Sequence, residues 1–151
     1  MKKTAKPAKK NVPKKETALS KVNEAMPPYQ LSKSAPVLKD FTYGAFRKIA
    51  DKAGFSQAEW AAILHVSERT LQRYAKNNGH FAAINAERAL QIDKILNEGK
   101  IAFGSYENFC QWLKGNPSML EGNLSVASLT TLDGIEKVST QLSRIQHGLF
   151  A

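Results

Sequence analysis

Four polar residues near the start of one predicted helix have side chains that can hydrogen-bond the edges of DNA bases. They are Ser67, Arg69, Thr70 and Arg73. An arginine can bind guanine O6 and N7 together, and each such contact is worth roughly 1–3 kcal/mol of discrimination against a wrong base. If the N-terminal end of this helix enters a major groove, Arg69 and Arg73 carry most of the sequence preference.

Four further residues are candidates for contacts with phosphates, which position a protein on DNA without reading its sequence. They are Gln57, at the start of the preceding predicted helix, and Arg47, Lys48 and Lys76. The alternative interpretation is that all these polar residues form only the solvated face of a small helical bundle.

Two short predicted helices carry most of these side chains. Ser56 and Glu59 form an S-x-x-E capping box at the start of the first helix, and Ser67 can cap the second. We therefore predict a helix-turn-helix at about residues 56–77. The apolar residues expected to face its core are Trp60, Ala61, Leu64, Leu71, Tyr74 and Ala75.

An earlier helix is predicted from Phe41, Ala45, Ile49 and Ala53, which recur at a spacing of four. Gly54 is expected to end this helix in a left-handed conformation.

The C-terminal half shows three more helical patterns. Asn85 is expected to cap a helix that runs to Asn97 and stops at Gly99, and Ser105 is expected to begin a helix that ends at Gly115.

The last helix has Asp133 and Glu136 as expected caps, and Gly148 as its expected end. Its apolar stripe consists of Ile135, Val138, Leu142 and Ile145. The fold class predicted for the whole chain is all-α.

The basic charge is concentrated at the N-terminus. Residues 1–40 hold ten lysines against Glu16, Glu24 and Asp40, a net charge of +7 (10 − 3) out of +9 for the chain. Residues 1–38 are predicted to be a disordered tail, because they have too little apolar surface to offset the entropy of ordering. Such a tail can attract phosphate backbones in a salt-dependent way, or it can be merely solubilising.

Catalysis is not expected. His65, His80 and His147 lie far apart in the sequence, and no metal-binding or phosphate-cradling motif is present. Cys110 lies among apolar residues on a predicted helix, which favours a buried structural role over a nucleophile. We expect no cofactor and no metal.

The compartment expected from the sequence is the cytoplasm. No stretch reaches the roughly 18 apolar residues of a membrane span, and the N-terminus has no apolar segment of a secretory signal. A single cysteine fits a reducing compartment, and no membrane partner is expected.

The predicted helix-turn-helix resembles those of bacterial Xre-type repressors. The positions that carry this resemblance are Gln57, Ala61, His65, Val66, Ser67 and Leu71. His65 is a departure, because glycine is usual at this turn, where φ is positive. Histidine tolerates that conformation better than most side chains.

Residues 81–151 resemble the toxin-binding domain of Xre/MbcA/ParS antitoxins. The segments that carry the resemblance are Lys100 to Ser105, Glu107, Trp112-Leu113, Asn116-Pro117, Leu129 to Thr131 and Arg144 to Gly148. Together with the tail predicted from composition (1–38), which lies outside the resemblance, this gives a helix-turn-helix domain at residues 39–80 and a helical toxin-binding domain at residues 81–151 as the expected domain organisation.

A type II antitoxin is what this resemblance implies, with a RES-domain toxin that consumes NAD as its partner. It also implies operator DNA as a partner, autorepression, and a homodimer or a larger hetero-oligomer with the toxin. The C-terminal segment is then expected to block the toxin's active site. The residues implied in toxin binding are Arg144, His147, Gly148, Leu149, Phe150 and Ala151.

Two other interpretations stay open. Leu149 and Phe150 can fold back on the protein's own core instead of meeting a partner. The chain can also be a stand-alone helix-turn-helix transcriptional regulator or a nucleoid-associated protein, with a C-terminal half that only dimerises.

Overall fold

The computed structural model describes residues 40–119 and 122–149, all of which belong to one compact unit. The described residues are mostly helical, and the predicted all-α fold class is confirmed. The predicted basic tail at residues 1–38 lies outside the described residues.

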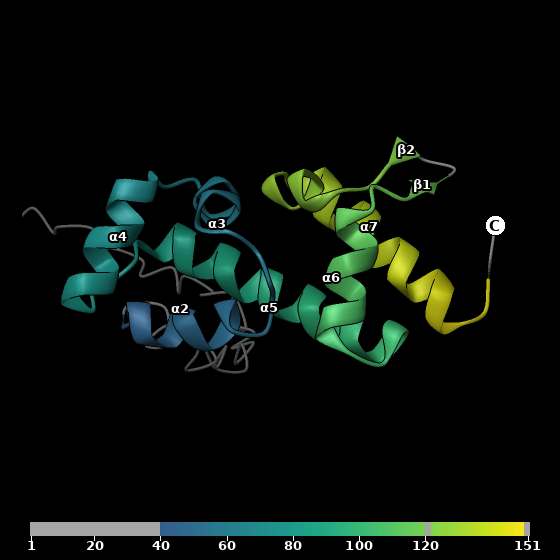
Figure 1. The fold of residues 1–151 in the computed structure, drawn as a ribbon, viewed down its shortest axis with the longest axis horizontal. Helices are drawn as coiled ribbons and strands as arrows, with labels where there is room; N and C mark the ends of the chain where they lie inside the picture. The colour runs from purple at the N-terminus through teal and green to yellow at the C-terminus, as the bar shows by residue number, and fades with distance from the viewer. Residues whose placement is uncertain (1–39, 120–121, 150–151) are drawn as a thin grey trace, which may run out of the picture. The chain divides into compact units, whose positions relative to one another are not determined.

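The first described helices are α2 (Tyr43–Ala50), α3 (Gln57–Leu64) and α4 (Glu68–Asn77). Helices α3 and α4 form the predicted helix-turn-helix (Figure 1). Trp60, Ala61, Leu64 and Leu71 are buried as expected, but the prediction for Ala75 is wrong, because its side chain is exposed.

The start of α2 is held by the loop that follows α4. The Gly44 N–H donates to Asn78 Oδ1 over 2.8 Å, and the Tyr43 N–H donates to the Gly79 carbonyl over 2.9 Å. The first N–H groups of a helix have no partner within the helix, so these bonds satisfy them from a distant segment. The end of α4 is thereby fixed to the start of α2.

The predicted end of α2 at Gly54 is wrong. The helix ends at Ala50, and Asp51, its C-terminal cap, has right-handed backbone angles. Positive φ among the described glycines occurs at Gly104, Gly122 and Gly148, not at Gly54. Two further turn hydrogen bonds, from the N–H groups of Lys52 and Ala53, continue the chain away from α2 without a left-handed residue.

Helix α5 (Ala83–Phe103) is longer at both ends than predicted. Asn85 does not cap it, because its Nδ2 donates instead to the Leu64 carbonyl at the end of α3, over 2.6 Å. Gly99 does not stop it either. Gly99 is buried inside the helix, which ends at Gly104 with φ 81°.

The remaining elements follow in chain order as α6 (Tyr106–Lys114), β1 (Ser118–Met119), β2 (Gly122–Asn123), the 3-10 helix η1 (Val126–Thr130) and α7 (Leu132–Gln146). Ser105 caps α6 as predicted. The predicted caps of α7, Asp133 and Glu136, are wrong: Thr131 Oγ1 accepts from the Gly134 N–H over 3.1 Å. Asp133 lies inside the first turn, where it forms an ion pair with Lys137.

One continuous buried cluster links the elements from Phe41 to Leu142. Helix α5 contacts α2 and α3, and also α6 and α7 (Figure 1). Gly99 permits the close contact with α6, because a Cβ there would lie 2.3 Å from Cγ of Phe109. The division into domains at residues 80 and 81 stays a prediction, and α5 is packed against elements on both sides of it.

Candidate nucleic-acid interface and C-terminal groove

The turn between α3 and α4 is built from local hydrogen bonds. Ser56 and Glu59 form the predicted capping box, with distances of 3.2 Å and 2.6 Å. His65 ends α3 with φ 55°, the left-handed conformation expected at this position. The Val66 N–H then donates to the Ala61 carbonyl over 3.0 Å, which closes the turn in a Schellman motif.

Ser67 caps α4, as predicted, so its hydroxyl already has partners within the protein. Its Oγ accepts from the Thr70 N–H over 3.0 Å and lies 2.9 Å from Thr70 Oγ1. Both side chains are fixed by this pair at the N-terminus of α4, where the helix dipole favours an anion such as a phosphate.

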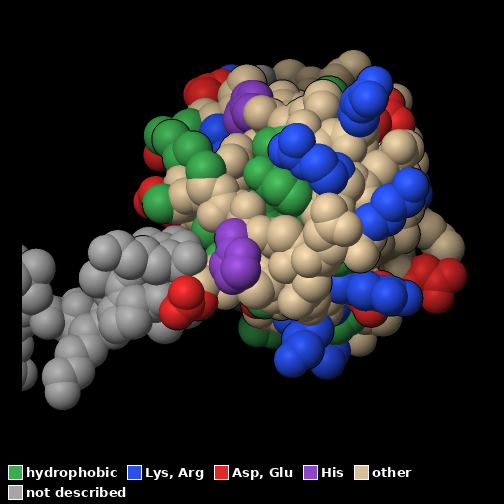
Figure 2. All heavy atoms as spheres, turned by 90° about the vertical axis from the view of Figure 1, so that its left-hand side faces the viewer, with side chains coloured by type: hydrophobic (Ala, Val, Ile, Leu, Met, Phe, Trp, Pro, Cys, Tyr) green, Lys and Arg blue, Asp and Glu red, His purple; other side chains and the backbone are tan. Residues whose placement is uncertain are grey.

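The outer face of α4 is hollowed, with a volume of about 390 Å³. The lining residues are Ser67, Arg69, Thr70, Gln72, Arg73 and Lys76. Figure 2 views this side of the molecule and shows Lys and Arg side chains spread over the face, with Asp and Glu toward its edges. Five predicted residues thus meet on one exposed surface that carries positive charge.

Gln72 is the lining residue that sequence reasoning missed. It lies three positions after Arg69 and four before Lys76, so helical spacing alone places it on the same face. Its amide can bind adenine N6 and N7 as a bidentate pair.

Three predicted phosphate contacts lie outside this hollow. Gln57 Nε2 donates to the Glu68 carbonyl over 3.3 Å, and so joins the starts of α3 and α4. Arg47 lies on α2, 4.0 Å from Asp51, and both side chains are 72% exposed. Lys48 lines a different groove, between α2 and α5.

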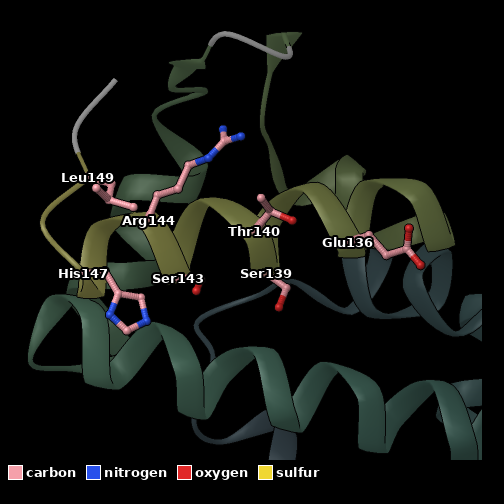
Figure 3. A pocket seen from close by; sticks show the side chains of 7 residues that line it. All are labelled: Glu136, Ser139, Thr140, Ser143, Arg144, His147 and Leu149. Atoms are coloured by element: carbon pink, nitrogen blue, oxygen red, sulfur yellow. The ribbon is translucent and has the colours of Figure 1, made fainter.

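A second groove, of about 510 Å³, runs along the outer side of α7. Figure 3 shows its lining side chains spaced along the helix. They are Glu136, Ser139, Thr140, Ser143, Arg144, His147 and Leu149. The structure therefore brings Arg144, His147 and Leu149 together and adds polar residues of α7 that sequence reasoning missed. Phe150 and Ala151 lie outside the described residues.

Gly148 ends α7 as predicted, with φ 67°. The Leu149 N–H donates to the Arg144 carbonyl over 2.8 Å, and the Gly148 N–H to the Ile145 carbonyl over 3.1 Å. This second Schellman motif turns the chain sharply at the helix end. Leu149 is 63% exposed, so it does not fold back into the core.

Part of the chain, including the helix-turn-helix, matches a known protein-family model. Residues 29–92 match the family model of the antitoxin Xre-like helix-turn-helix domain. The match supports an Xre-type antitoxin that binds DNA. A comparison with curated proteins finds no match.

The bounds of the Xre-like match differ from those of the predicted helix-turn-helix domain. The match contains α2, α3 and α4 and ends at Ile92, within α5. It begins at residue 29, inside the segment predicted to be a basic tail. The helix-turn-helix match overlaps residues 81–151, for which the resemblance implies a toxin-binding domain, only between residue 81 and Ile92.

Among the other candidate reactive groups, Cys110 is buried on α6. Burial raises the pKa of its thiol, which disfavours the nucleophilic thiolate. Within residues 40–119 and 122–149, no three His, Cys, Asp or Glu side chains are grouped so that they could hold a metal ion. The match to an antitoxin domain favours a non-enzymatic DNA-binding regulator.

None of the helices in the described parts of the chain is both long enough and apolar enough to cross a bilayer.

Proposed function

We propose that this chain is the antitoxin of a type II toxin–antitoxin pair, which reads operator DNA with α4 and neutralises a RES-domain toxin with the end of α7. The observation that carries the DNA-binding part is the exposed basic hollow on α4, inside the matched Xre-like domain. Arg69 and Arg73 read bases there, and Gln72 is a further candidate. Ser67, Thr70 and Lys76 lie where phosphate contacts would hold the helix in register.

The neutralising part rests on the groove along α7 and on the exposed chain end. Arg144 brings positive charge to this groove, which suits an enzyme pocket that binds the pyrophosphate of NAD. Leu149 is exposed beside it, and an exposed large apolar side chain gains free energy when a partner covers it. In this proposal Arg144, His147, Gly148, Leu149, Phe150 and Ala151 enter the toxin's pocket and exclude its substrate.

Autorepression follows from these two activities. Helix-turn-helix proteins commonly bind two half-sites as dimers, so a homodimer or a hetero-oligomer with the toxin would occupy the operator of its own operon.

The test is growth and intracellular NAD in bacteria that express the neighbouring open reading frame alone, with the full chain, or with the chain cut after His147. We expect the full chain to restore growth and NAD, and the truncated chain to fail. A harmless neighbour, or full rescue by the truncated chain, would contradict the blocking mechanism.

A pair of point variants separates blocking from folding. Leu149→Asp changes an exposed leucine at the end of α7, while Leu132→Asp changes one that is 57% exposed at its start. We expect Leu149→Asp to weaken rescue and Leu132→Asp to leave it unchanged. If the neighbour is harmless while specific DNA binding persists, a stand-alone regulator is the better description; DNA binding with little sequence preference would indicate a nucleoid-associated protein.

A further inference from the structure

An apolar groove between α2 and α5 is covered by none of the described residues. It has a volume of about 610 Å³. Its lining residues are Asp40, Phe41, Ala45, Lys48, Ile49, Leu90 and Asp93. Leu90, on α5, is 39% exposed in it, which is unfavourable for a large aliphatic side chain unless something covers it.

The described chain begins inside this groove. Asp40 is the first described residue and is itself part of the lining. The residues just before it are therefore tethered at the groove's edge, so that binding them there costs little loop-closure entropy. Ten extended residues span up to roughly 33 Å, which is ample for such a groove.

The chemistry of these preceding residues differs from that of the rest of the N-terminus. Residues 29–38 read YQLSKSAPVL, with Lys33 as their one charged residue. Their apolar side chains include those of Leu31, Val37 and Leu38. Residues 1–28 hold eight lysines (2, 3, 6, 9, 10, 14, 15 and 21) and end in Pro27-Pro28. The change in composition thus falls at about residue 29.

The family match begins at the same place. The antitoxin Xre-like helix-turn-helix domain is matched from residue 29, eleven positions before Asp40 (40 − 29). A domain model that includes these residues indicates that they belong with the folded unit rather than with the lysine-rich arm.

We propose that residues 29–38 of the same chain dock in the groove between α2 and α5, and that residues 1–28 stay outside it. Leu31, Val37 and Leu38 supply the apolar side chains that cover Leu90. Lys33 in the segment, and Lys39 directly after it, match the two carboxylates of the lining, Asp40 and Asp93. The predicted disordered tail then ends near residue 28 instead of residue 38.

The charge at one end of the groove is already partly balanced. Asp93 lies 2.6 Å from Lys52 Nζ, and this hydrogen bond raises the pKa of Lys52. Binding in the groove therefore relies mainly on apolar contact, and Lys33 and Lys39 only assist it. A substitution that makes the groove polar is the sharpest test.

Thiol labelling of the full chain tests the proposal directly. Val37→Cys places a thiol in the proposed docking segment, and Leu19→Cys places one in the arm as a matched control. The native Cys110 is buried and reports any loss of folding within the same sample. We expect the thiol at position 37 to react with a disulfide reagent at least about tenfold more slowly than the thiol at position 19.

Leu90→Lys, added to each cysteine variant, tests whether the groove causes the slow labelling at position 37. Leucine and lysine have similar helix propensities, so α5 is retained. We expect the change to accelerate labelling at position 37, to leave position 19 unchanged and to leave Cys110 protected.

Three results would overturn the proposal. Equal labelling rates at positions 37 and 19 would show that the segment is not docked. Protection at position 37 that survives Leu90→Lys would place the segment elsewhere. Protection that rises with protein concentration would indicate that a second copy of the chain fills the groove.

Discussion

His65 Nε2 lies 2.9 Å from the carbonyl oxygen of Thr130, 65 positions away in the sequence. His65 forms the left-handed turn between α3 and α4, and Thr130 is the last residue of η1, just before α7. Arg88 of α5 also approaches the same ring nitrogen, with its Nη2 at 3.3 Å. The turn of the helix-turn-helix is therefore tied to the C-terminal half by the side chain of His65.

His65→Asn is expected to remove this tie without disturbing the turn. Asparagine tolerates the left-handed conformation, but its side chain is too short to replace the imidazole. Losing one hydrogen bond of this kind should lower the free energy of unfolding by about 1 kcal/mol. Urea denaturation followed by circular dichroism measures the loss.

His65→Gly is the comparison for that experiment. Glycine also loses the bond but relieves the cost of a left-handed non-glycine residue, so we expect a smaller loss of stability than with asparagine. If both variants are as stable as the native chain, the contact between His65 and Thr130 contributes nothing to stability.

Gly99→Ala should be strongly destabilising. The added Cβ would lie 2.3 Å from Cγ of Phe109, and both residues are buried where α5 and α6 touch. Overpacking of this kind typically costs about 1–3 kcal/mol. Thermal denaturation should show the loss, and Gly54→Ala is the control, because a Cβ at Gly54 meets nothing within 4 Å and its φ is not positive. A stable Gly99→Ala chain would mean that α6 can move away from α5.

Arg69→Ala together with Arg73→Ala is expected to abolish the preference for the operator. Each lost base contact removes roughly 1–3 kcal/mol of discrimination, while non-specific binding through other basic residues persists. Gel-shift titrations measure the ratio of the affinity for operator DNA to the affinity for random DNA. Lys94→Ala, on a side chain 78% exposed on α5, should leave that ratio unchanged. If the double variant keeps its preference for the operator, α4 does not read bases in the major groove.

Removal of residues 2–28 should flatten the salt dependence of DNA binding. Each lysine that neutralises a phosphate adds nearly one to the slope of log affinity against log salt, and this segment holds eight of the lysines. Affinity measured across a salt series gives the slope before and after deletion. The same slope for both chains would mean that the lysine-rich arm does not contact DNA.

Cys110 should make stability depend on pH in alkaline solution. Burial raises the pKa of its thiol in the folded state above the ordinary value of about 8.5. Above that value the unfolded chain loses the thiol proton while the folded chain keeps it, so the free energy of unfolding falls as the pH rises. Urea titrations at pH 7 and pH 9.5 should show a smaller drop for Cys110→Ala than for the native chain. Equal drops would mean that the thiol does not contribute.

Local sequence predicted the elements whose ends are fixed by local bonds. Ser56, Ser67 and Ser105 each cap the helix that follows, because the accepting oxygen and the donating N–H lie within three residues. The predicted helix ends are wrong where a residue distant in the sequence determines the local structure. The side chain of Asn85 bonds the end of α3 instead of capping α5. Gly99 lies inside α5, where the absence of a Cβ lets Phe109 pack against the helix.

The candidate sites follow the same division. The residues of α4 share one face through helical spacing, which the sequence shows, although Gln72 was overlooked. Gln57 is predicted to contact phosphate from the start of α3, and its amide also bonds the start of α4, a contact that depends on how the two helices meet. The groove on α7 includes Ser139, which donates to Glu98 of α5 over 2.9 Å, and no local pattern predicts that partner.

Helix α5 has consequences for engineering. Its first turns hold the end of α3 through Asn85, and its last turns hold α6 and α7 through Gly99 and Glu98. In a chimaera joined at residue 80, α5 would come from one protein and the α3 against which it packs from another. Because their surfaces would not match, we expect such hybrids to fold poorly. Exchange of specificity should succeed only when α5 is rebuilt with both of its surfaces matched, or when changes are confined to the solvent-facing residues of α4 and α7.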